Sequence, residues 1–213
     1  MKRRIFFFVA VLISFGIFYS CSQLGGAGQE TVVRLQVSEG QAEEACREVM
    51  TSRLGGYDEE QLHFSWHFIP SVFYALQSAD SNGIQKEDLD SYAGSSSFLL
   101  EIKADKYHDE LLKFRMNEVN DYYRRIEYYS FHFHKDVQLV VDGDTFPCRS
   151  HHFERTYGVA PTVKISVNFP VPEEKLVNAS QVKLELYDRI FGQGIIKQAL
   201  EPGQIKTIQV TKR

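Results

Sequence analysis

The chain has 213 residues, 43% of them hydrophobic and 13% aromatic, so it can bury a substantial core and is not expected to be disordered. Asp and Glu outnumber Lys and Arg by 28 to 24, which gives a formal net charge of −4. An acidic balance of this kind excludes a nucleic-acid-binding protein and leaves no basic footprint for anionic lipid headgroups.

The first twenty residues have the three-part pattern of an export signal. Basic residues occupy positions 2–4, and residues 5–19 are apolar apart from Ser14 and Gly16. A run of this length lies at the upper end for the core of a signal peptide. A helix that crosses a bilayer needs roughly 20 apolar residues. We therefore expect residues 1–20 to be a cleaved signal peptide.

The end of this leader carries a small residue followed by a cysteine, Ser20 and Cys21. The segment resembles the lipobox of bacterial lipoproteins, in which that cysteine becomes diacylated. Phe18 and Tyr19 depart from the strict pattern, which prefers a smaller aliphatic residue followed by Ala or Ser. The resemblance implies a covalent lipid such as palmitate on Cys21. Two acyl chains bury enough methylene groups for stable membrane anchoring.

Residues 21–30 contain three glycines and no hydrophobic period, so they are expected to form a flexible lipidated tether with a reach of about 16 Å. By resemblance to lipoprotein sorting, Ser22 favours the outer membrane in a cell that has two membranes. Removal of the leader leaves 193 residues, with 21 basic against 28 acidic side chains and a formal charge of −7. The expected location is the cell envelope.

Residues 31–127 are predicted to form a mixed α/β region. Alternating apolar residues predict strands, whereas apolar residues three and four apart predict helices. The expected strands are 31–37, 61–69 and 98–103. The expected helices run from a cap at Ser38 to the glycines at 55–56, over 71–77, and over about 106–125.

Residues 128–213 are predicted to form an antiparallel, Ig-like β-sandwich, so the whole chain is expected to have an α+β fold. Asp142-Gly143-Asp144 is typical of a hairpin turn. Strands are expected at 129–134, 137–141, 145–146, 163–169, 181–187, 194–199 and 205–210. The boundary near residue 127 is a change of period without a Pro- or Gly-rich linker, which leaves a shared core open.

The candidate metal ligands are His132, His134 and His152. Alternate residues of a strand point the same way, so His132 and His134 are placed to share one ion, with His152 as a third ligand. The alternative is that they are the polar residues of an amphipathic strand. No His-Glu-x-x-His or Cys-x-x-Cys spacing supports the metal site.

Serine and cysteine residues give two further patterns. The segment 94–98 (GSSSF) is similar to a nucleophile elbow, but Phe98 stands where the second glycine belongs, which favours a polar loop. Cys46 and Cys148 form a candidate disulfide, because an exported chain meets an oxidising compartment. The alternative for Cys46 is a buried thiol on the apolar side of a helix.

Three functions remain open at this point. The first is a non-catalytic lipoprotein, held at the membrane through its lipid, that binds an envelope protein or glycan or assists an envelope assembly. The second is a metal-dependent envelope hydrolase built on the histidine cluster. The third is an immunity lipoprotein that blocks a toxin. No cofactor is expected other than the lipid on Cys21, and no motif in the mature part marks an enzyme.

Overall fold

The computed structural model describes residues 32–59, 61–79, 81, 83–155, 160–200 and 204–211. The leader, Cys21 and the tether lie outside these residues. The strands are β1 (Val32–Ser38), β2 (Gly55–Glu59), β3 (Leu62–Ile69), β4 (Ser96–Ala104), β5 (Val137–Val141), β6 (Asp144–Pro147), β7 (Ser150–Glu154), β8 (Thr162–Phe169), β9 (Val182–Asp188), β10 (Gly194–Leu200) and β11 (Ile205–Thr211).

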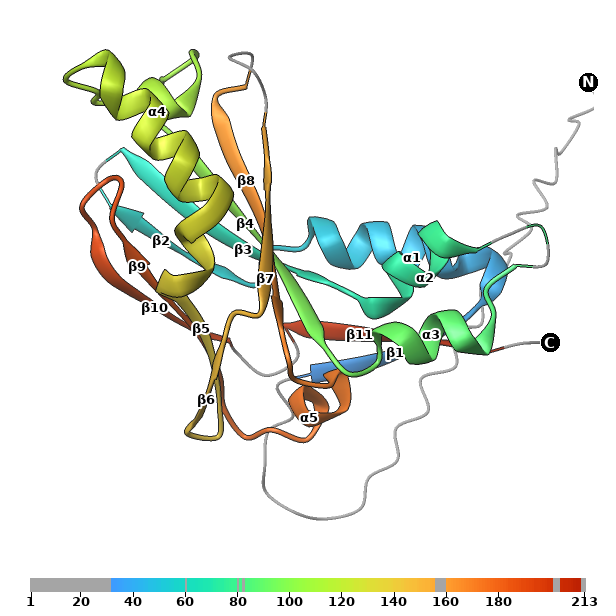
Figure 1. Cartoon of the computed structure of the whole chain (residues 1–213). Helices are drawn as coiled ribbons and strands as arrows, with labels where there is room; N and C mark the ends of the chain where they lie inside the picture. Colours follow the sequence, from blue (N-terminus) through green and yellow to red (C-terminus); the bar gives the residue numbers. More distant parts are fainter. Residues whose placement is uncertain are drawn as a thin grey trace, which may run out of the picture.

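The helices are α1 (Glu39–Thr51), α2 (Ser71–Ser78), α3 (Lys86–Tyr92), α4 (Val119–Glu127) and α5 (Glu173–Val177). Three short turns complete the list: 3-10 turns at Leu111–Lys113 (η1) and Phe133–Asp136 (η3), and a π-helical turn at Tyr128–His132 (η2). Helices α1, α2 and α3 gather with β1 and β11 at one end of the molecule, and α4 lies at the opposite end (Figure 1).

Two antiparallel sheets form the body of the fold. One has the strand order β2-β3-β4-β8-β7 and the other β10-β9-β5-β6, while β1 and β11 form a separate parallel pair. The predicted α+β fold with an antiparallel β-sandwich is thus confirmed. The larger sheet joins β2, β3 and β4 from the first half to β7 and β8 from the second (Figure 1). The boundary expected near residue 127 therefore runs through a single sheet.

One hydrophobic core fills the space that the sheets and α1 enclose. Alternate residues are buried along β3, β4, β8 and β9, as expected for strands with one face on a core. Trp66, Phe64, Phe98 and Phe169 are among the largest fully buried side chains. Side chains from both sheets belong to the same cluster, so both halves of the chain depend on one core.

The segment after the β5–β6 hairpin passes from one sheet to the other. The Cys148 amide still donates to the carbonyl of Val137 on β5, at 3.3 Å. The next amide, that of Arg149, donates to Asn168 on β8, at 2.8 Å. Strand β7, which was not among the expected strands, therefore lies at the edge of the larger sheet.

The long helix predicted over residues 106–125 is wrong. Lys106 and Arg115 have positive φ values of 57° and 51°, which a right-handed helix does not accommodate. Asp121 accepts the amide hydrogens of residues 117 and 118, so α4 begins only at Val119. Buried Arg125 donates to the carbonyls of Leu112 and Phe114, at 2.8 and 2.7 Å. Its guanidinium thereby holds the irregular segment that replaces the first half of the predicted helix.

The strand predicted over residues 129–134 is also wrong, because α4 continues directly into η2 and η3. Tyr129 and Phe133 are almost fully buried and lie four residues apart, which is the spacing of one helical face. Residues 129–134 therefore form helical turns, although aromatic and polar residues alternate along them.

Candidate functional site

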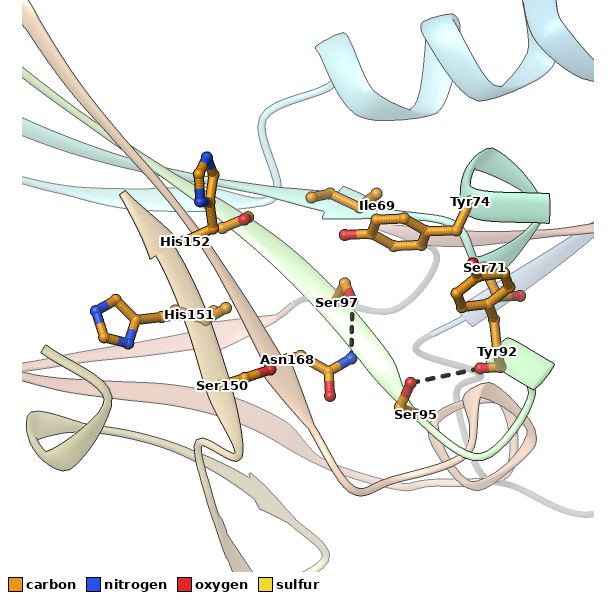
Figure 2. A pocket seen from close by; sticks show the side chains of 12 residues that line it. Ile69, Ser71, Tyr74, Tyr92, Ser95, Ser97, Ser150, His151, His152 and Asn168 are labelled. Carbon is orange, nitrogen blue, oxygen red and sulfur yellow. Dashed lines mark hydrogen bonds between the residues drawn. The ribbon is translucent and has the colours of Figure 1, made fainter. Parts of the chain in front are cut away.

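The outer face of the larger sheet carries a cavity of about 290 Å³ near the ends of α2 and α3. Its described lining comes from α2, α3, β3, β4, β7 and β8, and none of it is Asp, Glu, Lys or Arg. Figure 2 shows these side chains, with two tyrosines on one side and the β7 residues on the other. The side chains are those of Ile69, Ser71, Tyr74, Tyr92, Ser95, Ser97, Ser150, His151, His152, Ser166, Val167 and Asn168.

The floor of the cavity is set by strand register. Ser97 on β4 is opposite Asn168 on β8, and Asn168 is opposite Ser150 on β7. One step along the sheet, Ser166 is opposite His152. Because side chains alternate across a strand, these polar groups share the face opposite the core. The Asn168 amide donates to the Ser97 hydroxyl at 3.1 Å, which fixes both (Figure 2).

Tyr74 of α2 and Tyr92 of α3 form the aromatic wall. Their rings stack with centroids 5.4 Å apart and an interplanar angle of 29°. The Tyr92 hydroxyl is 3.1 Å from the Ser78 hydroxyl, so Tyr92 is tied to α2. Stacking and this contact together fix the orientation of the wall.

Several polar groups of the cavity have no hydrogen-bond partner among the residues that the structure describes. They are the hydroxyls of Tyr74, Ser150 and Ser166, the imidazole of His152, and the amide oxygen of Asn168. Groups of this kind remain available to a ligand, and a concave site with a few convergent polar groups is the usual form of a small-molecule site.

Helix α2 is held at its start by a carboxylate from a distant part of the chain. Pro70 ends the pairing of β3, and the amide of Ser71 donates to Glu173 at 2.6 Å. Burial raises the pKa of Glu173 from 4.5 to about 7, although the hydrogen bonds from Ser71 act in the opposite direction. The position of Tyr74 thus depends on a contact between α2 and α5.

Helix α3 is positioned by a contact from α1 and capped by one of its own side chains. Glu39 of α1 accepts the amide hydrogen of Ile84 at 2.7 Å. Asp88 accepts the amide hydrogen of Gln85 at 2.9 Å, which caps the helix N-terminus. These contacts hold Tyr92, at the end of α3, over the sheet.

The three candidate metal ligands do not meet. His132 lies on η2 and is 3.8 Å from Glu127, whereas His134 lies on η3 and stacks on His151 with ring centroids 5.2 Å apart. His152 lies in the cavity, and the His151 ring points away from the tyrosines (Figure 2). Within the described ranges, no three His, Cys, Asp or Glu side chains are placed to hold a metal ion. The expected strand face does not exist, which is why the cluster is not assembled.

His151 has a structural environment of its own. Its Nε2–H donates to the carbonyl of Tyr129 at 2.8 Å, which fixes the ring against η2. Burial lowers the pKa of His151.

The candidate disulfide is not formed, since Cys46 and Cys148 are both free and buried. Cys46 lies on the buried face of α1, whereas Cys148 lies at the crossing between the sheets and donates to the carbonyl of Ser150 at 3.1 Å. Burial raises the pKa of each thiol to about 11. Both thiols are therefore protonated and poorly nucleophilic at neutral pH.

Most of the cavity residues were not predicted as a site from the sequence. The serines of segment 94–98 were expected in a polar loop, but Ser96 begins β4, and Ser97 is part of the cavity floor. Helix α3 and strand β7 were not predicted at all. One signal was present: Ser166 and Asn168 are small polar residues that alternate with the buried apolar residues of β8.

Similarity to known proteins is limited to solved structures. No protein-family model and no curated protein matches the chain. The solved structures that match include an uncharacterized β-sandwich protein from Clostridium difficile 630, with 8% identity and a TM-score of 0.33 over 70% of this chain and 91% of that one. In the part of the chain that is described, no helix combines the length and apolarity needed to cross a bilayer.

Proposed function

We propose that the protein is a lipid-anchored lipoprotein of the cell envelope, whose folded domain binds a ligand in the cavity beneath α2 and α3 without catalysing a reaction. The observation that carries the binding role is the set of uncommitted polar groups that converge on this cavity beside Tyr74 and Tyr92. The anchor rests on the sequence of the leader and on Cys21.

The chemistry of the cavity supports binding over catalysis. Hydrolysis of a glycosidic bond typically uses two carboxyl groups that flank the bond, and the described lining contains none. Nucleophilic catalysis by serine requires a base within hydrogen-bond reach. The Ser97 hydroxyl instead accepts from Asn168. Ser166 is opposite His152, but the two side chains are not hydrogen-bonded to each other.

Location follows from the lipid alone in this proposal. The acidic mature chain has no electrostatic attraction for anionic headgroups, so residence at the membrane depends on acylation. The ligand is accordingly sought within the envelope, in the short range that the tether of residues 21–30 allows.

The anchor is tested by intact-mass measurement of protein extracted from membranes, for the wild type and for Cys21→Ser. We expect the wild type to lack residues 1–20 and to carry acyl mass. We expect Cys21→Ser to carry no acyl mass. An unmodified leader on the wild type, or a mature chain without acyl mass, would contradict the proposal.

The binding role is tested by blocking the cavity. Ser166→Phe places a ring on the floor of the cavity, whereas Thr145→Phe introduces a ring at an exposed site on β6. Envelope components that co-purify with the wild type in mild detergent should be lost from Ser166→Phe and retained by Thr145→Phe. Equal recovery with both variants would place binding elsewhere.

A further inference from the structure

We infer that the ligand of this cavity is an uncharged saccharide, one or two sugar rings of an envelope glycan. This inference rests on the proposed binding role and adds the chemical class of the ligand. The three observations that carry it are the charge of the lining, its aromatic wall and the arrangement of its free hydrogen-bonding groups.

The charge of the lining selects against ionic ligands. A phosphate, sulfate or carboxylate group is usually held by Arg, Lys or a helix N-terminus, and an ammonium group by a carboxylate. The described lining contains no Asp, Glu, Lys or Arg. The amide of Ser71 at the start of α2 is already occupied by Glu173. A buried charge on the ligand would therefore remain unpaired, which is costly.

The aromatic wall suits the apolar face of a sugar ring. Tyrosine offers a large, rigid surface with a polar edge, and it loses little conformational entropy on binding. The stacked pair Tyr74 and Tyr92 forms such a surface at one side of the cavity (Figure 2). The hydroxyl of Tyr74 lies at the cavity and is not engaged by any described residue.

The free polar groups match a ligand that both donates and accepts hydrogen bonds. The hydroxyls of Ser150 and Ser166 can donate or accept, the Asn168 oxygen accepts, and the two ring nitrogens of His152 are further hydrogen-bonding groups. Sugar hydroxyls have the same dual character. A hydrocarbon ligand would leave these groups without partners, since it offers neither donor nor acceptor.

The size of the cavity limits the ligand to a short segment. Its volume of about 290 Å³ lies at the lower end of the usual range for ligand sites, roughly 300–1,000 Å³. Ser150 and His152 lie on β7, the edge strand of the sheet, and are exposed. A longer glycan would continue past these two residues into solvent.

The test is calorimetric titration of the full-length lipoprotein in micelles of a detergent that has no sugar headgroup. The probes are two neutral disaccharides, cellobiose and chitobiose, a digalacturonate as the charged sugar, and adenosine as a stacking ligand that is not a saccharide. We expect binding of at least one neutral disaccharide and a weaker response to digalacturonate.

Variants assign that binding to the cavity. Tyr74→Ala should weaken it about tenfold or more, because the stacking surface and one hydroxyl are lost. Tyr74→Phe keeps the ring and should weaken binding only a few-fold. It is the control that separates loss of the stacking surface from a folding defect in Tyr74→Ala. Tyr123→Ala removes an exposed tyrosine of α4 and should leave the affinity unchanged.

The outcomes separate the inference from the proposed function. Binding of adenosine or digalacturonate alone, lost in Tyr74→Ala, would overturn the saccharide assignment and leave the binding role intact. Saccharide binding unaffected by Tyr74→Ala would overturn the site. No binding of any probe would overturn the saccharide inference, while the loss of envelope components from Ser166→Phe would still uphold a binding role.

Discussion

Replacement of Glu173 by Gln tests how the cavity wall is held in place. The Glu173 carboxylate accepts the amide hydrogen of Ser71 at the start of the helix that carries Tyr74. Gln keeps an oxygen acceptor at this position but cannot ionise. The substitution therefore removes the charge while it preserves the contact between α5 and α2.

The expected change in the free energy of unfolding follows from the pKa of Glu173, which burial raises from 4.5 to about 7. Between these values the folded state holds a proton that the unfolded state has lost, so the free energy of unfolding falls as pH rises. Each unit of pKa displacement corresponds to about 1.4 kcal/mol, so a displacement of about 2.5 units gives a loss of at most about 3.5 kcal/mol at high pH. Well below pH 4.5 the loss is absent, because both states are protonated.

The assay is urea unfolding of the wild type, Glu173→Gln and Glu174→Gln at pH 4.5, 6 and 8. We expect Glu173→Gln to gain stability relative to the wild type as pH rises, by about 2 to 3 kcal/mol between the two extremes. Exposed Glu174 is the matched control and should show no such trend. A difference between Glu173→Gln and the wild type that stays constant with pH would refute the reasoning.

Three further predictions concern the scaffold. Arg125→Met should lower the free energy of unfolding by about 3 kcal/mol, because it leaves buried carbonyls without donors. Gly143→Ala should lower the free energy of unfolding by about 1 kcal/mol, because alanine disfavours the φ of 91° at this position. A Cβ at residue 143 meets open space, so a steric clash adds nothing to this loss. Gly40→Ala, equally open but helical, should stabilise by about 0.5–1 kcal/mol. The thiols of Cys46 and Cys148 should react with a thiol reagent at pH 8 only after unfolding.

For each of these predictions, a specific result would contradict the reasoning. Denaturant unfolding that places Arg125→Met within about 0.5 kcal/mol of the wild type would mean that its carbonyl contacts contribute little. Equal effects of alanine at positions 143 and 40 would contradict the role of the positive φ. Fast labelling of either thiol in the folded protein would show that it is not buried.

Local signals were sufficient for most of the strands and for the hairpin. Asp142 and Gly143 have φ values of 50° and 91°, and such a turn matches the twist of the flanking strands. Asp142 also accepts amide hydrogens from Ser180 and Gln181, at 2.8 and 2.9 Å. The sequence Asp-Gly between two apolar runs therefore predicts this turn without knowledge of the rest of the fold.

Period alone failed where two periods fit the same residues. Tyr129 and Phe133 lie on one face at helical spacing, and residue 131 between them also fits a strand. The helical conformation is favoured by packing against β7, where the rings of Tyr129 and Phe153 have centroids 5.6 Å apart. Contacts of this kind join distant parts of the chain, so a local pattern does not contain them.

The cavity could not be predicted for the same reason. Its floor joins Ser97, Asn168 and Ser150, which come from three strands and become neighbours only through the register of the sheet. Its wall depends on Glu173, about a hundred residues beyond the helix that it caps. Only the polar alternates of β8 gave a hint, and polar alternates are ordinary on any half-exposed strand.

The most direct test of the central claim, that this cavity is the working surface of the lipoprotein, is hydrogen–deuterium exchange. Full-length protein in micelles is compared with and without a solubilised envelope glycan fraction. We predict slower exchange in peptides from α2, α3, β7 and β8, and unchanged exchange in α4. Protection confined to α4, or no protection in the presence of material that co-purifies with the protein, would contradict the claim.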